Sequence, residues 1–144
     1  MKIRYADGND IDFLVKGRRQ IRIAEKREGI ETQAYDKRDL AQAVRKRNVR
    51  VIDVDGKPAG FLWFRPGFRV MYMDSYLWVH LIYVEEGFRH RGIGRTLYDD
   101  AARIARGMGM ERIVIDVFKA NGGSIGFHRE MGFKPIYAIY QKPV

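Results

Sequence analysis

The sequence predicts a single α/β domain whose mixed sheet carries helices on both faces. Three observations support this. Helix-like and strand-like patterns alternate along the 144 residues, and no repeat or linker divides residues 1–144. Asp55-Gly56 joins two β-rich runs, which indicates an antiparallel hairpin. A strand, a helix and a further strand follow one another over residues 76–118, which indicates a parallel crossover.

The first half of the chain is expected to place two helices between strands. Residues 2–6 alternate as a short strand does, and the Asn-Asp pair at 9–10 can cap a helix that Gly17 should weaken. A second helix is expected to open near Asp36, with its basic end favoured by the helix dipole. The hairpin, over residues 50–65, follows it.

The second half is expected to form strand, helix, strand, helix and strand. Residues 76–84 are almost unbroken in apolarity, as in a central strand covered on both faces. Residues 112–118 indicate another buried strand, 124–131 a short helix, and 134–142 a closing strand. The helix after the first strand has apolar residues at helical spacing: Ile93, Leu97, Ala101, Ile104 and Met108.

Composition narrows the function classes. The chain has no cysteine, which excludes disulfides, a thiol nucleophile and thiolate metal ligands. His80, His90 and His128 lack metal-ligand spacing, so we expect no metal. No window approaches the roughly 18 apolar residues of a membrane span, and no signal peptide is evident, so a soluble cytoplasmic protein is expected.

Most of the net charge of +9 lies in residues 16–50, which hold twelve Lys and Arg against five Asp and Glu. A basic segment can steer a polyanion, and a solvated basic face is the commoner reason for one. One alternative function is therefore a basic nucleic-acid-binding or ribosome-associated module. No RNA-reading motif accompanies the charge, so we do not expect nucleic acid as a partner.

A strand-to-helix corner over residues 88–95 suits an anion. Backbone N–H groups at a helix N-terminus favour phosphate, Gly92 and Gly94 allow close approach, and arginines add charge. The Lys-Ser/Thr of a Walker A loop is absent, and Leu97 stands where a dinucleotide fingerprint needs a third glycine. The alternative is an exposed basic turn without a ligand.

Two segments carry a resemblance to a known family. "RHRGIG" (89–94) resembles the R/Q-x-x-G-x-G/A signature of the GNAT N-acetyltransferases, and "NGGSIGFHREMGF" (121–133) resembles their Asn-x-x-Ser/Ala-x-x-Phe-Tyr-x-x-x-Gly-Phe segment. The resemblance covers residues 76–134 in motif detail. It implies the GNAT fold, with a central parallel strand pair splayed at the cofactor site. It also implies transfer of acetyl from acetyl-CoA to a primary amine, by direct attack in a ternary complex.

The resemblance also implies which residues contact acetyl-CoA. The strand end Ile82, Tyr83 and Val84 would present its backbone to the pantetheine arm and the thioester carbonyl, with Tyr83 or Val84 supplying the oxyanion N–H. Asn121 would be a further contact. The corner would hold the pyrophosphate through Arg89, His90, Arg91, Gly92, Ile93, Gly94 and Arg95.

The proton donor to the departing thiolate is the main departure from the family pattern. Many members carry a tyrosine after the phenylalanine of the second motif, whereas this chain has His128 after Phe127. A histidine can be protonated near neutral pH, so His128 is a candidate general acid. The alternatives are a helix-surface residue that touches CoA or a domain that binds acyl-CoA without catalysis.

Three residues are candidates for the general base, and water is a fourth. Asp116 is the lone acid in a strand expected to be buried, where an unpaired carboxylate is costly. His80 lies mid-strand, where alternation predicts the same face as Trp78, Ile82 and Val84, although a satisfied core histidine is the commoner role at such a position. Glu85 follows the strand end, near the expected thioester.

The acceptor and the oligomeric state stay open. A polyamine, an amino acid, an antibiotic, a protein lysine and a protein N-terminus all fit a primary-amine acceptor. The aromatic run over residues 61–78 lies where the family builds part of its acceptor pocket. The predicted last strand, 134–142, could pair across a two-fold axis, so a homodimer is one possible partner arrangement.

Overall fold

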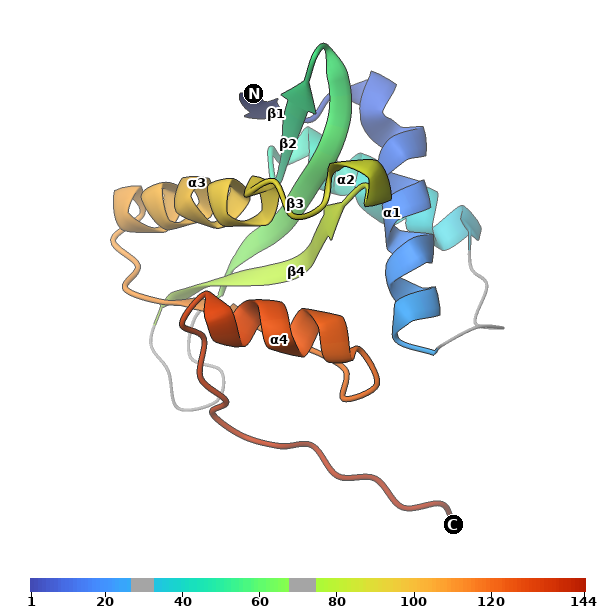
Figure 1. Cartoon of the computed structure of the whole chain (residues 1–144), viewed down its shortest axis with the longest axis vertical. Helices are drawn as coiled ribbons and strands as arrows, with labels where there is room; N and C mark the ends of the chain where they lie inside the picture. Colours follow the sequence, from blue (N-terminus) through green and yellow to red (C-terminus); the bar gives the residue numbers. More distant parts are fainter. Residues whose placement is uncertain (27–32, 68–74) are drawn as a thin grey trace.

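The computed structural model describes residues 1–26, 33–67 and 75–144. Five strands form one sheet in the order β1-β2-β3-β4-β5, antiparallel except for the parallel pair β4-β5 (Figure 1). This confirms the mixed, mostly antiparallel sheet. The elements are β1 (Lys2–Tyr5), η1 (Gly8–Asp10), α1 (Ile11–Ala24), α2 (Gln33–Arg45), β2 (Val49–Val54), β3 (Lys57–Gly67), β4 (Tyr76–Val84), η2 (Glu86–Phe88), α3 (Ile93–Gly107), β5 (Ile113–Ile115) and α4 (Gly122–Glu130).

Helices cover both faces of the sheet, as predicted. On one face, Leu97 and Ala101 of α3 pack with Leu62 and Val79, and Phe127 of α4 joins this core. On the other face, Leu14 of α1 and Leu40 of α2 pack with Phe61 and other strand residues. The burial of apolar side chains on both faces is the main term that holds these layers together.

The hairpin prediction is confirmed at Asp55-Gly56, which joins β2 and β3. Both residues have positive φ, 52° and 77°, as a tight two-residue turn of this kind requires. Asp and Gly adopt this conformation at low cost, so the local sequence specifies the turn.

The first two helices differ from the prediction at their ends. Helix α1 does not weaken at Gly17 but continues to Ala24. A Cβ on Gly17 would lie 2.4 Å from the Phe61 ring and 2.8 Å from the Tyr83 ring, so the glycine allows the helix to approach the sheet closely. Helix α2 begins at Gln33, before the predicted start near Asp36.

The C-terminal side of the sheet is smaller than predicted. Strand β5 covers only Ile113–Ile115, and residues 134–142 form no strand but extend away from the domain (Figure 1). The parallel pair β4-β5 therefore lies at the edge of the sheet, where a central pair was expected. A strand needs a neighbouring strand to hydrogen-bond its backbone. The alternating pattern of 134–142 favours an extended conformation but does not provide that neighbour.

Within the described ranges 1–26, 33–67 and 75–144, no helix combines the length and the apolarity needed to cross a bilayer.

Candidate functional site

Strands β4 and β5 diverge, which leaves the end of β4 open on one edge. They pair only from Leu77↔Ile113 to Val79↔Ile115, and β4 continues to Val84. The N–H of Glu85 donates to the carbonyl of Ala59 at 2.8 Å on the β3 side.

The direction of that hydrogen bond shows which edge of the strand each backbone N–H of β4 faces. Successive residues of a strand point their N–H groups to opposite edges, so Ile82 and Val84 direct theirs to the open edge and Tyr83 directs its own to β3. Of the two oxyanion candidates, the geometry favours Val84.

The loop after β4 leads the chain into the N-terminus of α3. The Arg89 Nε donates to the Val84 carbonyl at 3.0 Å, which ties the loop to the strand end. His90 and Gly92 have positive φ, 62° and 79°, and Gly92 is the N-cap of α3. Within the described part of the chain no side chain caps this helix, so the first-turn amides are available to an anion.

The two glycines of the corner have different roles. A Cβ on Gly92 would meet nothing within 4 Å, so its left-handed backbone is what favours glycine there. A Cβ on Gly94 would lie 2.7 Å from the Phe127 ring, so Gly94 is needed for close packing between α3 and α4. The Gly-x-Gly pair therefore sets both the backbone conformation of the corner and the packing of α3 against α4.

Asn121 is the N-cap of α4. Its Oδ1 accepts the N–H of Ser124 at 3.2 Å, which satisfies one of the helix's unpaired donors. The Asn121 side-chain oxygen therefore already has a hydrogen-bond partner within the protein.

His128 is buried, with 4% of its surface exposed, between α4 and α3. Its Nδ1 lies 2.7 Å from the Ser124 carbonyl, which can only accept, so Nδ1 carries the proton. Nε2 therefore accepts from the Tyr98 hydroxyl, 2.6 Å away. Burial lowers the pKa of His128 below its ordinary 6.5, although the Ser124 carbonyl opposes this, and the neutral ring is favoured.

His80 is the extra residue of a β-bulge in β4. Phe64 pairs with Val79 and Trp63 pairs with Leu81, so His80 has no partner residue on β3. Its ring stacks on Trp63 at 4.7 Å between centroids and on Trp78 at 5.9 Å.

The bulge reverses the alternation of the strand. The expected shared face with Trp78 is confirmed, whereas Ile82 and Val84 pack against the core beneath α3 on the opposite face. The prediction that His80 shares a face with Ile82 and Val84 was therefore wrong.

Charges around His80 act on its protonation. Burial lowers its pKa below 6.5, the cationic Arg65 and Arg18 lower it further, and Asp116 acts in the opposite direction. Asp116 is exposed just beyond β5, so the expectation of an acid in a buried strand was wrong, and it accepts from the Trp78 Nε1 at 3.3 Å. The fold brings His80 and Asp116 together at the point where β4 and β5 diverge.

Glu85 takes part in a separate network. Its Oε1 accepts from the Lys16 ammonium at 2.6 Å and its Oε2 from the Tyr83 hydroxyl at 2.9 Å. The Lys16 contact holds the pKa of Glu85 below its ordinary value, whereas burial and Glu85 raise the pKa of Tyr83 to about 12. Glu85 is therefore a charged carboxylate and a weak proton acceptor.

Sequence reasoning missed the partners of these groups. Tyr98 and Lys16 lie on helices far from His128 and Glu85 in the chain, and no local pattern pairs them. A tyrosine among the apolar positions of α3 was the one available signal. Among the residues that the structure describes, no three His, Asp or Glu side chains cluster as a metal site would require.

Comparisons with known proteins identify the family and the fold of the chain. Residues 18–133 match the model of the Acetyltransferase (GNAT) family. An uncharacterized N-acetyltransferase of Methanocaldococcus jannaschii, MJ1207, is 32% identical over 89 residues, which are 58% of this chain and 38% of that protein. The chain thus spans well under half the length of this curated relative.

Solved structures share the fold. A mutant of the BH1408 protein from Bacillus halodurans superposes with a TM-score of 0.84 at 19% identity, over 100% of this chain and 99% of that one. The aminoglycoside N-acetyltransferase AAC(6')-Iy in complex with CoA gives 0.81 at 16% identity, over 99% and 93%. A ribosomal-protein-alanine N-acetyltransferase from Brucella melitensis gives 0.75 at 16% identity over the full length of both chains. With most of its length matched by the family model, the chain belongs to the GNAT family of acetyltransferases.

Proposed function

We propose that this protein is an acetyl-CoA-dependent N-acetyltransferase that moves the acetyl group to a primary amine by direct attack in a ternary complex. The observation that carries the proposal is that an open strand edge and an uncapped helix N-terminus adjoin in this fold. The open edge of β4 at Ile82 and Val84 continues, through a loop tied down by Arg89, into the uncapped N-terminus of α3.

The residues present fit the two ends of CoA. The amides of Ile93, Gly94 and Arg95, with the exposed Arg91 and Arg95 side chains, would hold the pyrophosphate. The backbone N–H and C=O of Ile82 would pair with the pantetheine amides, and the Val84 N–H would face the thioester. Acetyl-CoA supplies an activated acyl group with a thiolate as its leaving group.

The side chains of the chain would then handle the protons. His80, held neutral, would take a proton from the acceptor ammonium, directly or through water, because only a neutral amine attacks a carbonyl. The Val84 N–H would stabilise the oxyanion, which is worth on the order of 3 kcal/mol for one well-placed donor. As the C–S bond breaks and the amide forms, the thiolate takes a proton from the amine nitrogen or from solvent.

The other candidates receive different roles in this proposal. Asp116 adjusts the pKa of His80, and Glu85 anchors the strand end through Lys16. His128 positions α4 against α3, since its only proton is donated to the Ser124 carbonyl. Neighbours of this fold carry names with different acceptors, an aminoglycoside and a ribosomal-protein alanine, so the acceptor class stays open.

The nucleic-acid alternative is weakened by how several basic residues of the 16–50 segment are used. Arg18 and Arg22 of α1 form ion pairs with the buried Asp36 of α2. Arg50 is buried and pairs with Asp100. These charges hold the fold together instead of forming a free binding face.

Calorimetric titration with CoA tests the cofactor site. CoA at about 100 times its dissociation constant should add roughly 2.7 kcal/mol to the free energy of unfolding. Arg95→Ala, at the first turn of α3, should weaken binding, whereas Arg106→Ala, at the last turn of the same helix, should not. Absence of CoA binding, together with salt-sensitive RNA binding, would favour the nucleic-acid module.

A thiol-release assay tests catalysis. Acetyl-CoA is incubated with a panel of primary amines that includes a polyamine, an aminoglycoside, amino acids and peptides with a free lysine or N-terminus. Release of CoA that depends on one of these amines supports the enzyme. CoA binding without release on any amine would leave the acyl-CoA-binding domain as the function.

A further inference from the structure

A row of stacked side chains surrounds the candidate base on the face of the sheet that α1 and α2 cover. The His80 ring stacks on Trp63 at 4.7 Å and on Trp78 at 5.9 Å between ring centroids. The Arg18 guanidinium lies 5.1 Å from the centroid of the Trp63 ring, and the Arg65 guanidinium lies 5.4 Å from that of Trp78. The imidazole is therefore the centre of a row that has a guanidinium at each end.

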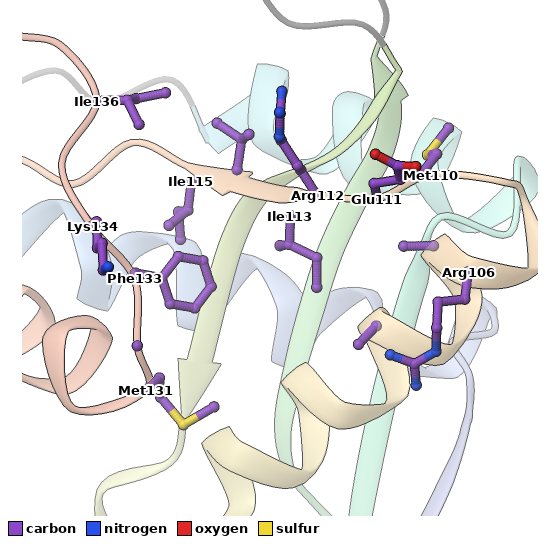
Figure 2. A pocket seen from close by; sticks show the side chains of 14 residues that line it. Arg106, Met110, Glu111, Arg112, Ile113, Ile115, Met131, Phe133, Lys134 and Ile136 are labelled. Carbon is purple, nitrogen blue, oxygen red and sulfur yellow. The ribbon is translucent and has the colours of Figure 1, made fainter.

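The hollow beside β5 lies mainly on the other side of the sheet from this row. It encloses about 630 Å³ between β5 and the chain after α4 (Figure 2). Ala102 and Ala105 of α3 line it, which places it on the α3 side. Trp63, by contrast, packs in the cluster formed with α1 and α2. We therefore expect an acceptor amine to reach His80 from the α1 side, beside the row.

The two arginines of the row differ in what already holds them. The Arg18 Nε donates to a carboxylate oxygen of Asp36 at 2.9 Å, so this guanidinium is engaged within the fold. Arg65 of β3 is exposed, and among the residues that the structure describes it has no acidic partner. A guanidinium over an aromatic face keeps the planar fork of N–H donors that matches a carboxylate. Arg65 is therefore the cation of the row that is available to a ligand.

Two guanidiniums and one carboxylate act on His80. Arg65 faces it from β3, Arg18 from α1, and Asp116 from the chain just after β5. Asp116 already accepts from the Trp78 Nε1 at 3.3 Å. A polycationic acceptor brought to the imidazole would meet two like charges, which repel it. An amine that also carries a carboxylate would instead gain a charge-assisted pair with a guanidinium.

We propose that the acceptor is an amine that carries a carboxylate within a few bonds of the reacting nitrogen, and that Arg65 selects it. This rests on the proposed acetyl transfer to a primary amine. Arg65 would bind the carboxylate through its N–H fork, and the Trp78 face would hold the guanidinium in place. His80 would meanwhile take the proton from the acceptor nitrogen. The same arrangement disfavours polyamines and aminoglycosides, because their further amino groups are cationic.

Matched acceptor pairs test the acceptor class. Phenylalanine and phenylalaninamide differ in the α-carboxylate, whereas the dipeptide amides of Glu-Ala and Gln-Ala differ in a side-chain carboxylate. The two pairs therefore separate a free amino acid from an acidic peptide. The value of kcat/KM is measured on the plateau of the pH profile and calculated for the neutral form of each amine. The unchanged enzyme should prefer the acid in at least one pair.

Arg65→Met tests the selecting residue. It should lower the acid-to-amide ratio of kcat/KM by about 10–100-fold in the preferred pair, mainly through a higher KM for the acid. Any change in the protonation of His80 cancels in this ratio, because both acceptors use the same base. Arg106→Met makes the same chemical change at the last turn of α3 and should leave the ratio unchanged. CoA affinity should be equal in all three proteins, since Arg65 lies on β3, away from the N-terminus of α3.

Failure of the acceptor class and failure of the proposed function give different results. CoA release that is as fast with the amides or with spermidine as with the acids would overturn the acceptor class and leave the acetyltransferase standing. An acid preference that survives Arg65→Met would overturn the role of Arg65. CoA binding without release on any of these amines would contradict the proposed function itself.

Discussion

Tyr98 donates its hydroxyl hydrogen to Nε2 of His128 across 2.6 Å, inside the contact between α3 and α4. Both side chains are buried, and burial raises the pKa of Tyr98 far above its ordinary value of 10.0. Gly94 and Phe127 meet in the same helix contact. The pair therefore joins the helix that begins at the anion corner to the helix that carries the second motif.

Removing the hydroxyl should destabilise the fold without stopping CoA binding. Tyr98→Phe leaves the Nε2 acceptor of His128 buried and unpaired, which should lower the free energy of unfolding by about 1–3 kcal/mol. Urea unfolding of the two proteins measures the difference. An unchanged midpoint would mean that the pair contributes nothing to stability.

The stability of the protein should fall on acidification, in part through His128. The folded-state pKa of His128 is depressed, so its contribution is fully present above the unfolded pKa of about 6.5 and is lost as the pH falls below that value. In His128→Gln, the loss of unfolding free energy between pH 7 and pH 5 should be smaller than in the unchanged protein. Equal losses would show that His128 does not titrate differently in the two states.

His80→Gln should reduce kcat/KM for the acceptor by about 10²–10⁴-fold if His80 is the general base. In the unchanged enzyme, kcat/KM should rise with pH along a limb centred below pH 6.5, because the pKa of His80 is depressed. That limb should be absent from the residual activity of His80→Gln. If the variant keeps both the rate and the limb, the base is water or another residue.

Two substitutions should move this limb in opposite directions. Asp116→Asn removes the charge that raises the pKa of His80, so the limb should move to lower pH. Arg65→Met removes a charge that lowers the pKa, so the limb should move to higher pH. Complete inactivation of Asp116→Asn at every pH would instead identify Asp116 as the base.

Gly94→Ala should weaken both stability and CoA affinity. The added methyl would lie 2.7 Å from the Phe127 ring, so α3 and α4 must separate. Overpacking of this kind should lower the free energy of unfolding by about 1–3 kcal/mol. Gly107→Ala in the last turn of the same helix has open space for its methyl and is the control. Thermal unfolding with and without CoA measures both effects. Equal behaviour of the two variants would exclude the packing role of Gly94.

The buried ion pair between Arg50 and Asp100 should be sensitive to loss of one partner. Arg50 Nε lies 2.7 Å from Asp100 Oδ2, and both side chains are about nine-tenths buried. Asp100→Leu leaves the Arg50 charge uncompensated and should cost about 3–5 kcal/mol of unfolding free energy. Arg103→Ala removes only an exposed partner of the same carboxylate and should change stability far less. Similar losses in the two variants would contradict this ranking.

Much of the fold could be predicted because its signals are local. The Asp55-Gly56 turn, the apolar run of β4 and the spacing of α3 each depend on residues within a few positions of one another. The two family motifs are also contiguous, so the glycine-containing corner at residues 88–95 could be recognised as a family motif without the fold.

The proton-handling residues depended on the tertiary structure, because burial and pKa are set by neighbours from distant elements. The bulge in β4 turned His80 away from the face of Ile82, and the short β5 left Asp116 exposed. Tyr98 and Ser124 together engaged both nitrogens of His128. The sequence by itself determined the family, the element order as far as α4, and the glycine-containing corner before α3. Only the packing of α3, α4 and the diverging strands decided which ionisable groups stay neutral, and which strand edge stays unpaired.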